Sequence, residues 1–400
     1  YPLRRQRQMC IRDRNNSRWW YFNKWFIWVM IKSFIIQKTK LNVNLNELFS
    51  KKFKIKSFPR DYDIQFENKL NYLINLINKK DSIIIIDKNI SQKYFKKIKN
   101  KKIIIIKSIE NNKNFKTVNK VLEFFLKNNV SKSNKIYAIG GGIIQDIAGY
   151  ACLTYKRGLH WEYVPTTFLG MTDSCVGGKV GINYGDAKNL LALFSAPRKV
   201  ILNINFLKTL PKSDLLSGLG EALRLHVTGG QYFVDEFKKN IDGALKFNNK
   251  DLINIIRNSL LVKKAVVEED EYEFNIRRSM NFGHSYGHAL EILCEHSLAH
   301  GTAVSIGMCV ESILSLTKFN IDRSVVETII KLAKKLITKK DFKIIKNIKL
   351  NNLNKVMLKD KKTLNGIIKL TVPKKRGKIE FYDQKLNTKN VIETTLKKKG

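Results

Sequence analysis

The chain has 400 residues, of which 44% are hydrophobic and 27% are charged, and these ordinary globular proportions exclude wholesale disorder, a collagen-like fibre and a polytopic membrane protein. The 74 Lys and Arg residues outnumber the 34 Asp and Glu residues, which gives a formal net charge of +40. Because the lysines are spread along the whole chain and form no stripe interleaved with aromatic residues, we interpret them as the bias of a Lys-, Asn- and Ile-rich proteome in which lysine fills tolerant surface positions. The charge can also help to attract an anionic small-molecule substrate. We expect no nucleic-acid or membrane partner, and a basic protein that binds nucleic acid or an anionic membrane is the alternative.

The N-terminal residues differ in texture from the rest of the chain. The segment YPLRRQRQMCIRDR uses Arg where the body of the chain uses Lys, and it resembles the translation of a sequencing adapter. Four of the five Trp residues follow within an apolar run, which Asn23, Lys24 and Lys32 interrupt. These polar residues disfavour a membrane anchor or a signal peptide and leave an interfacial helix as the alternative. We predict that Met30 is the true start and that residues 1–29 are a non-native leader.

The five cysteines indicate a reducing compartment. Their number is odd, no Cys-x-x-Cys pair occurs, and the chain is long. A disulfide framework or a structural zinc site is therefore not expected. We predict a cytoplasmic protein.

Residues 30–135 alternate short Ile-rich runs with amphipathic stretches rich in Lys and Asn. The runs DSIIIIDK (81–88) and KKIIIIKS (101–108) are β-branched and bounded by polar residues, which predicts buried parallel strands. Apolar residues at spacings of three and four predict helices over 69–79 and 115–129. Strands that alternate with helices indicate an α/β sheet.

A glycine turn joins a strand to a helix in NKIYAIGGGIIQDIAGYACLTY. The predicted strand Lys135–Ile139 runs into Gly140, Gly141 and Gly142. A glycine turn at a helix N-terminus offers free N–H groups and a positive dipole end to a pyrophosphate, although this turn is not the G-x-G-x-x-G fingerprint. A tight turn without a ligand is the alternative. Asp146 would meet either a ribose or an N–H group of the first helical turn.

A second glycine-rich stretch, YVPTTFLGMTDSCVGGKVGIN followed by GDAKN, has the composition of a ligand-binding loop. Of the 22 glycines in the chain, 14 fall between residues 140 and 230, so the enrichment is local. The polar residues set among them are Thr166, Thr167, Asp173, Lys179, Lys188 and Asn189. Such a loop makes a poor core and a good ligand surface, and a surface loop with incidental charges is the alternative.

From about residue 214 the pattern becomes helical. The segments with helical apolar spacing are 214–227, 251–273, 285–297 and 302–319. We place a domain boundary near residue 212, with an α/β domain over 30–212 and a mostly helical domain over 213–400.

Histidines concentrate in the helical half of the chain. His284 and His288 stand four residues apart on one predicted helix, and His300 follows after a short break. Two histidines from one helix with a third ligand from elsewhere suit a catalytic zinc ion that keeps an open position. Glu221, an isolated acid in SGLGEALR, is the candidate carboxylate ligand. The H-x-x-x-H pattern alone is weak, because most such pairs are incidental.

A polar pattern precedes these histidines in EFNIRRSMNFGH. Glu273, Arg277, Asn281 and His284 recur at spacings of four, four and three, so they share one face if a helix persists through the segment. Such a face is costly to bury without a ligand. A solvated face is the alternative, but solvated faces in this chain are Lys-rich and this one is not.

Seven segments, taken together, resemble the 3-dehydroquinate synthase family of the sugar-phosphate cyclases. They are GGGIIQDIAGYACLTYKRG, PTTFLGMTDSCVGGKVGIN, KNLLALFSAPRKV, FLKTLP, SGLGEAL, RRSMNFGHSYGHALE and HGTAVSIGM. They occur in the order of the family and cover roughly residues 135–310. The resemblance implies a Rossmann-like NAD-binding α/β domain, a C-terminal helical domain that binds metal and substrate, and an active site between them.

The resemblance also implies roles for individual residues. The Zn²⁺ ligands would be Glu221, His284 and His300, with Co²⁺ as an alternative metal. The NAD site would comprise Gly141, Gly142, Asp146, Thr166, Thr167 and Thr209, extended by Asp87, Glu110, Lys113, Asp173, Lys179 and Lys188. The substrate would be contacted by Arg157, Asp173, Lys179, Lys188, Asn189, Lys263, Glu273, Arg277, Asn281 and His288, together with Arg224 and one lysine of the pair Lys361 and Lys362.

The implied enzyme is a carbon–oxygen lyase that acts in the shikimate pathway. It would convert 3-deoxy-D-arabino-heptulosonate 7-phosphate to 3-dehydroquinate and phosphate by transient oxidation with NAD⁺, phosphate elimination, reduction and aldol closure, and the family suggests a homodimer. Arg224 stands where the family usually has Lys, and Thr302 where Glu is common. These departures leave another sugar 7-phosphate cyclase as an alternative. Metal-dependent alcohol or glycerol dehydrogenases share the architecture and form a more distant one.

Overall fold

The computed structural model describes residues 30–385 except for residues 97, 186, 296, 320, 347, 349, 359–366 and 376. The predicted leader, residues 1–29, lies outside the described residues, as do Lys361 and Lys362. None of the described helices combines the length and the apolar character that crossing a bilayer requires.

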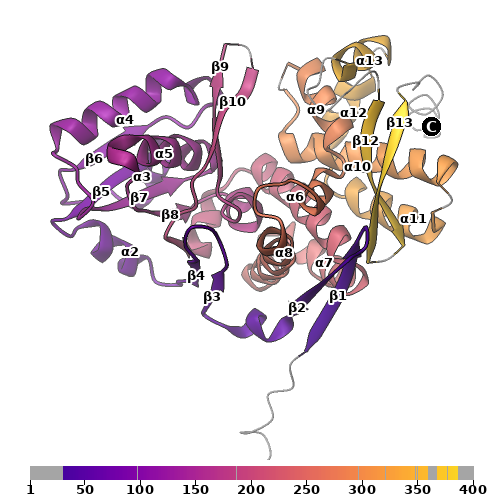
Figure 1. The fold of residues 1–400 in the computed structure, drawn as a ribbon, viewed down its shortest axis with the longest axis horizontal. Helices are drawn as coiled ribbons and strands as arrows, with labels where there is room; N and C mark the ends of the chain where they lie inside the picture. The colour runs from indigo at the N-terminus through magenta and orange to yellow at the C-terminus, as the bar shows by residue number, and fades with distance from the viewer. Residues whose placement is uncertain are drawn as a thin grey trace, which may run out of the picture.

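A seven-stranded sheet forms the centre of the N-terminal half (Figure 1). Its strands, in spatial order, are β3 (Lys52–Ile55), β4 (Tyr62–Phe66), β11 (Lys199–Leu202), β8 (Trp161–Pro165), β7 (Lys135–Gly140), β5 (Ser82–Asp87) and β6 (Ile103–Ile106). All neighbouring pairs are parallel except β3 and β4. The two predicted Ile-rich strands are therefore confirmed. The predicted burial holds for β5 but not for β6, an edge strand whose Ile105 is 53% exposed.

Helices cover both faces of this sheet. They are α2 (Leu70–Ile77), α3 (Lys88–Tyr94), α4 (Phe115–Lys127) and α5 (Gly142–Thr154). Figure 1 shows α4 and α5 on one side of the sheet and α2 on the other. The helices predicted over 69–79 and 115–129 are confirmed as α2 and α4, and the predicted strand–glycine–helix unit is confirmed as β7, the glycine turn and α5.

Eight helices are described in the C-terminal half. They are α6 (Lys212–Gly229), α7 (Gln231–Ala244), α8 (Asn249–Glu269), α9 (His284–Leu293), α10 (His300–Lys318), α11 (Arg323–Lys334), α12 (Lys339–Lys346) and α13 (Leu350–Leu358). Helix α6 is buried on nearly all sides, because α7, α8 and α10 pack around it. The boundary predicted near residue 212 coincides with the first residue of α6.

The two ends of the described chain meet in a second sheet. The hairpin β1 (Ile31–Ile36) and β2 (Thr39–Asn44) pairs with the hairpin β12 (Ile367–Lys375) and β13 (Lys378–Lys385) through parallel β1 and β13. Phe34 of β1 belongs to the same buried cluster as Leu225 and Leu261 of the helical half. The prediction assigns residues 31–44 to the α/β domain, but in the structure they pack against the helical half.

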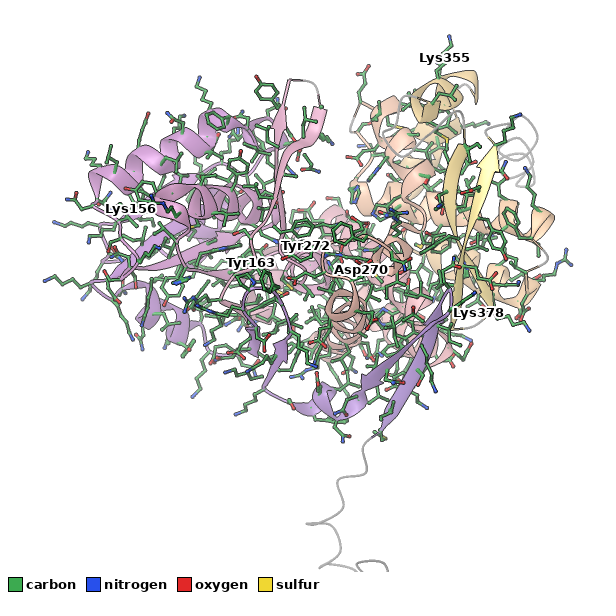
Figure 2. All side chains as sticks on the ribbon, viewed as in Figure 1. Lys156, Tyr163, Asp270, Tyr272, Lys355 and Lys378 are labelled. Carbon is green, nitrogen blue, oxygen red and sulfur yellow. The ribbon has the colours of Figure 1, made fainter. Side chains whose placement is uncertain are left out.

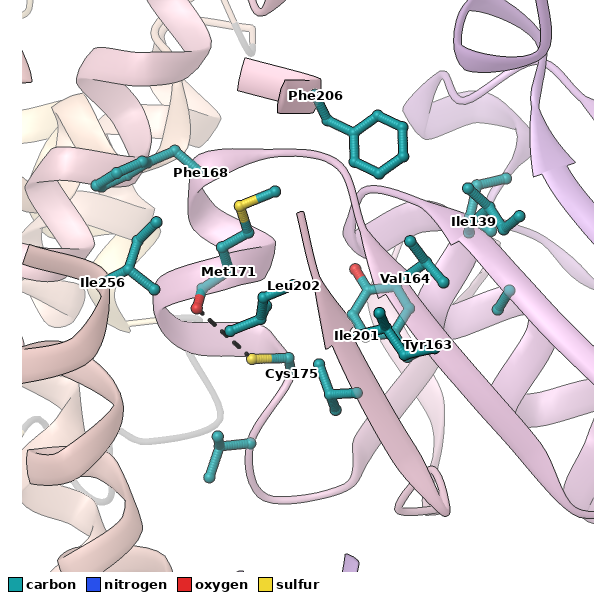
Figure 3. Close-up of a cluster of buried hydrophobic side chains, with 14 of the residues drawn as sticks. Ile139, Tyr163, Val164, Phe168, Met171, Cys175, Ile201, Leu202, Phe206 and Ile256 are labelled. Carbon is teal, nitrogen blue, oxygen red and sulfur yellow. Dashed lines mark hydrogen bonds between the residues drawn. The ribbon is translucent and has the colours of Figure 1, made fainter. Parts of the chain in front are cut away.

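One continuous core joins the two halves. Figure 3 shows Leu202 of β11 beside Met171, whose carbonyl accepts a hydrogen bond from the Cys175 thiol at 3.7 Å. Tyr163 and Val164 of β8 belong to the same cluster. Ile256 of α8 belongs to the same cluster. The halves are thus held together by apolar packing, which fixes the geometry of any site between them.

A separate hairpin and six short helical turns complete the described structure. The hairpin consists of β9 (Lys179–Tyr184) and β10 (Ala187–Phe194), and it rises between the two halves (Figure 1). The short turns are η3 (Leu45–Phe49), η4 (Glu110–Asn112), η5 (Tyr155–Arg157), the π-helical η6 (Gly170–Ser174), η7 (Ile204–Thr209) and η8 (Ile276–Asn281). Most of the predicted polar site residues lie on or beside this hairpin and these turns.

Candidate active site between the two halves

Close helix packing brings one acid and two imidazoles together. At Gly301 of α10, a Cβ atom would lie 1.7 Å from the carbonyl oxygen of Ser217 on α6, so only glycine allows the two helices to approach this closely. The Ser217 hydroxyl accepts a hydrogen bond from the Gly301 N–H at 2.9 Å and fixes the contact. As a result, Glu221 of α6 faces His300, the first residue of α10.

The predicted metal ligands converge. Glu221 Oε1 lies 3.3 Å from His300 Nε2 and 3.6 Å from His284 Nε2. His288 stands beside them, so that nitrogen atoms of the three imidazoles lie within 4.8 Å of one another. Glu221 is 1% exposed, and its Oε1 has no hydrogen-bond donor among the described residues. A buried carboxylate oxygen that faces two imidazole nitrogens fits a divalent cation, because these are ligand atoms that zinc prefers and a bound cation can replace a proton between them.

The orientation of each imidazole has a visible cause. Gly283 precedes α9 at φ +79°, and the Nδ1 of the next residue, His284, is 3.3 Å from the Phe282 carbonyl. Burial lowers the pKa of His284 well below its usual value, so its neutral form can donate from Nδ1 and direct Nε2 towards Glu221. Burial also opposes the charge of His300, but the adjacent carboxylates of Glu221 and Glu291 raise the pKa of His300 to about 10 when no metal ion is bound.

A buried ionic network extends from the acid towards the sheet domain. Arg224, one turn after Glu221, donates from Nε to Glu221 Oε2 at 2.7 Å and from Nη2 to Asp173 Oδ2 at 3.1 Å. Lys263 of α8 contacts the same aspartate at 2.6 Å. Burial alone would raise the pKa of Asp173, but Lys263 and Arg224 lower it overall. Asp173 is therefore ionised and tied to two cations.

The face predicted for Glu273, Arg277, Asn281 and His284 is wrong as a helical face. Helix α8 ends at Glu269, residues 276–281 form the short turn η8, and α9 begins at His284. The backbone cannot continue one helix, because Glu273 adopts φ +62° and Gly283 φ +79°. Two of these side chains are nevertheless in contact, because the loop brings Glu273 to Asn281, from which it accepts a hydrogen bond at 3.1 Å. Glu273 also accepts a hydrogen bond from Lys179 of β9.

Asp270 organises the loop that carries Arg277. Its carboxylate accepts hydrogen bonds from the N–H groups of Phe274, Asn275 and Arg277 at 2.8–2.9 Å. The Arg277 guanidinium is buried and donates to the Gly177 carbonyl at 3.2 Å and to that of Glu271. Figure 2 shows Asp270 near the middle of the molecule. The loop thereby holds a cation at the boundary between the two halves.

The glycine turn lies at the carboxyl ends of the parallel strands, where open α/β sheets bind ligands. Gly140 ends β7, and the Thr166 N–H, just after β8, donates to its carbonyl at 3.0 Å. A Cβ atom on Gly141 would lie 2.9 Å from the Thr167 methyl group, whereas one on Gly142 would meet nothing within 4 Å. The start of α5 is therefore open to a ligand.

A second polar network lies beside this turn. Lys113 donates to Asp146 Oδ2 at 2.8 Å and to Asn189 Oδ1 at 2.5 Å, and Asp146 Oδ1 accepts from the Gly181 N–H at 3.1 Å. Burial raises the pKa of Asp146, although Lys113 opposes that shift. Asp146 thus meets a lysine and a strand N–H instead of the first turn of α5. Glu110 joins the network by accepting from Asn183 at 2.8 Å.

Other predicted residues lie at the margin or outside the site. Asp87 caps α3 by accepting from the Ile90 N–H at 3.0 Å, and the exposed Thr209 shares a 2.9 Å hydrogen bond with Tyr94. Arg157 is exposed and follows the far end of α5 from the glycine turn, so within one copy of the chain it does not join the cluster. Lys361 falls outside the described residues.

The sequence reading missed three residues that hold the site together. Glu291 bridges His300 at 3.0 Å and Lys188 at 2.8 Å. Gln145 of α5 makes two hydrogen bonds to Ser174, at 2.6 and 2.7 Å, and so anchors the turn that bears Asp173. Asp270 is the third. Of the three, only Glu291 could have been found from the sequence. It stands seven residues after His284 and three after His288, a spacing that puts it on the same helical face.

The charges of the cluster suit an anionic ligand. Three lysines (179, 188 and 263) and two arginines (224 and 277) meet the carboxylates of residues 173, 221, 273 and 291. The five Lys and Arg side chains outnumber the four carboxylates, and a protonated His300 or a divalent cation would add to the positive charge. Such a site matches a small molecule that carries a phosphate and a carboxylate.

Family models and curated proteins resemble the chain over most of its length. A model described as "3-dehydroquinate synthase N-terminal" matches residues 103–217, and one described as "3-dehydroquinate synthase C-terminal" matches residues 218–363. The 3-dehydroquinate synthase of Pelagibacter ubique is 34% identical over 355 residues, which are 84% of this chain and 96% of that protein. That of Alkaliphilus metalliredigens is 36% identical over 278 residues, which are 69% and 77%.

Solved structures confirm the predicted fold of an α/β half followed by a helical half. The 2-epi-5-epi-valiolone synthase from Streptomyces hygroscopicus, solved with NAD⁺ and Zn²⁺, has a TM-score of 0.74 at 20% identity and covers 87% of this chain and 100% of its own. A 2-deoxy-scyllo-inosose synthase complexed with carbaglucose-6-phosphate, NAD⁺ and Co²⁺ has a TM-score of 0.72 at 22% identity, covering 87% and 99%. A glycerol dehydrogenase from Schizosaccharomyces pombe is more distant, with a TM-score of 0.55 at 15% identity, covering 74% and 82%.

Proposed function

This chain belongs to the 3-dehydroquinate synthase family, and on that premise we propose which of its residues carry the reaction. The chain is a lyase of the shikimate pathway, which serves aromatic amino-acid biosynthesis. It converts 3-deoxy-D-arabino-heptulosonate 7-phosphate to 3-dehydroquinate and phosphate.

The proposed cofactors are a divalent cation and NAD⁺. Glu221, His284 and His300 would hold Zn²⁺, with Co²⁺ as an alternative, and the glycine turn at Gly141 and Gly142 would hold the pyrophosphate of NAD⁺. When bound, the cation supplies polarisation of a substrate oxygen and NAD⁺ supplies transient acceptance of a hydride. The observation that supports the proposal is the buried Oε1 of Glu221, which has no hydrogen-bond donor within the described part of the chain and faces two imidazoles.

The proposed substrate contacts follow from charge and geometry. Arg277 suits the substrate carboxylate, because a planar guanidinium can bind both carboxylate oxygens. Lys179, Lys188 and Lys263 supply positive charge for the phosphate, and His288 is proposed as a further contact to it. Because the leaving phosphate can itself accept a proton, these side chains mainly need to hold it in place during elimination. Asp173 keeps Lys263 and Arg224 oriented, and Arg224 takes the place of the family lysine with the same charge.

The remaining predicted contacts complete two sets. For NAD⁺ we propose Asp146, Lys113, Glu110, Thr166, Thr167, Thr209 and Asp87, with Asp173, Lys179 and Lys188 shared with the substrate. For the substrate we propose Glu273, Asn281, Asn189 and Arg157, with Lys361. A homodimer in the cytoplasm remains part of the proposal, and sedimentation velocity would test the oligomeric state.

One assay tests the reaction and the cofactor roles together. The purified protein is incubated with the heptulosonate phosphate, Zn²⁺ and a catalytic amount of NAD⁺, and phosphate and NADH are measured. We expect many equivalents of phosphate for each NAD⁺ and no net NADH. Stoichiometric NADH without phosphate would instead identify a dehydrogenase.

A further inference from the structure

Glu291 connects the proposed metal site to the β9–β10 hairpin. It lies on α9, on the same face as His284 and His288. Its Oε2 is 3.0 Å from His300 Nδ1, and its Oε1 is 2.8 Å from the Lys188 ammonium group of β10. The Glu291 side chain is 13% exposed and that of Lys188 is 35% exposed. One carboxylate therefore spans the helical half and the hairpin.

We propose that Glu291 is the positioning residue of the metal site, which fixes the ring of His300 with Nε2 towards Glu221 and anchors the hairpin through Lys188. The inference rests on the proposed metal ligands. It requires no contact between Glu291 and the metal or the substrate.

The physical basis is the pairing of the two imidazole nitrogens. When Nδ1–H donates to a carboxylate, the tautomer and ring orientation are fixed, and the Nε2 lone pair becomes a better ligand. The orientation of the His300 ring depends on this hydrogen bond to a carboxylate more than that of the His284 ring does. The Phe282 carbonyl holds His284 Nδ1, and the surrounding protein encloses the His284 ring. The His300 ring is 35% exposed, so packing alone restrains it less.

Lys188 gives the same carboxylate a second role. The ion pair joins a residue of the sheet half to a helix of the metal half. It holds the ammonium group next to the proposed metal ligands, where we expect the substrate phosphate. Loss of Glu291 should therefore weaken metal binding through His300 and substrate binding through Lys188, whereas loss of Lys188 should affect the substrate alone.

The test measures Zn²⁺ affinity by competition with a chromophoric chelator and the visible spectrum of the Co²⁺-substituted protein. The control variant is Glu295→Gln, because Glu295 is an exposed carboxylate just past the end of α9. For Glu291→Ala we expect a loss of Zn²⁺ affinity of about 10-fold to 100-fold and an altered Co²⁺ spectrum. Glu291→Gln keeps an acceptor oxygen, so its loss of Zn²⁺ affinity should be several-fold smaller than that of Glu291→Ala. Glu295→Gln and Lys188→Gln should bind Zn²⁺ with the parent affinity.

The outcomes separate this inference from the proposed function. If His284→Ala abolishes Zn²⁺ binding but folded Glu291→Ala binds Zn²⁺ with the parent affinity and Co²⁺ spectrum, the positioning role is overturned and the ligand assignment stands. If His284→Ala also keeps stoichiometric Zn²⁺, the ligand assignment itself fails. Should Glu291→Ala not fold, Glu291→Leu decides, because Leu has a similar size but offers no acceptor to His300 Nδ1, and parent affinity and spectrum in that variant also overturn the role.

Discussion

The metal cluster and the glycine turn place their functional groups in contrasting ways. Glu221 is buried and the His284 side chain is 12% exposed, and close helix contacts at Gly301, between α10 and α6, and at Gly287, between α9 and α10, hold them in place. At the glycine turn, Gly142 faces open space, and the neighbouring polar groups come from short turns and the β9–β10 hairpin. Both regions hold buried ion pairs, since the side chains of Lys113 and Asp146 are as little exposed as those of Lys263 and Asp173, but only the glycine turn has open space beside its backbone for a ligand.

This contrast predicts different costs of substitution. A change in the metal region leaves a buried charge without its partner, so stability and function fall together. Beside the glycine turn the polar side chains share several hydrogen bonds and the backbone is open, so a substitution that keeps a hydrogen-bond acceptor should lower ligand affinity while the fold persists. The following substitutions test this difference, from the largest expected effect to the smallest.

Substitution of His284 by Ala should have the largest effect on activity. It removes one of three proposed ligands, so we expect Zn²⁺ binding to be lost and kcat/KM to fall by at least about 1,000-fold. NAD⁺ binding should persist, because the glycine turn lies in the other half. Metal analysis, steady-state kinetics and NAD⁺ titration check this, and stoichiometric zinc in the variant would contradict it. His288→Ala is the matched control and should retain the metal.

Substitution of Arg224 by Ala should have the largest effect on stability. It leaves the carboxylates of Glu221 and Asp173 buried without their shared cation, at a cost of about 3–5 kcal/mol. Arg224→Lys keeps the charge but cannot donate to both acids with one planar group, so a smaller loss is expected. Urea unfolding measures both. Equal stability of the parent and the Ala variant would show that the network does not stabilise this half.

How far the sequence predicts the site depends on whether each residue has a local signal. His284 and His288 are four residues apart on one helix, and Gly141 and Gly142 lie between a strand and a helix, so spacing finds them. The sequence offers Glu221 as a candidate carboxylate, but only the family resemblance indicates that it forms one ligand set with His300. Helix packing between residues about 80 positions apart leaves no local pattern. The predicted face through Glu273 failed for a related reason, since positive φ angles break a helix without changing the residue spacing.

Substitution of Arg277 by Lys probes the boundary between the two regions. The guanidinium is fixed by backbone carbonyls, and Lys would keep the charge but lose the planar pair of donors. We expect KM for the heptulosonate phosphate to rise about ten-fold or more, with little change in NAD⁺ affinity. Isothermal titration with each ligand separates these effects. Equal losses for both ligands would refute a role specific to the substrate.

Substitution of Asp146 by Asn tests the region beside the glycine turn. Lys113 loses its ionic partner but keeps Asn189, and the amide oxygen of the substituted side chain can still accept a hydrogen bond. We expect NAD⁺ affinity to fall by about five-fold, which corresponds to about 1 kcal/mol, while Zn²⁺ content and the unfolding midpoint stay near those of the parent. A large loss of stability would erase the contrast between the two regions.

Substitution of Asp270 by Asn should give the smallest effect and one that depends on pH. Burial would raise the pKa of Asp270, but the N–H groups of Arg277, Asn275 and Phe274 lower it overall. A carboxylate whose pKa is lower in the folded state stabilises the protein above its unfolded pKa, about 3.9, and loses this contribution as the pH falls through the folded value. Because Asp270 is partly exposed, the parent should exceed Asp270→Asn by about 1 kcal/mol or less from pH 7 to 5, with the difference shrinking below about pH 4. Urea unfolding across this range measures it. A difference that grows on acidification would mean that the loop does not favour the ionised form.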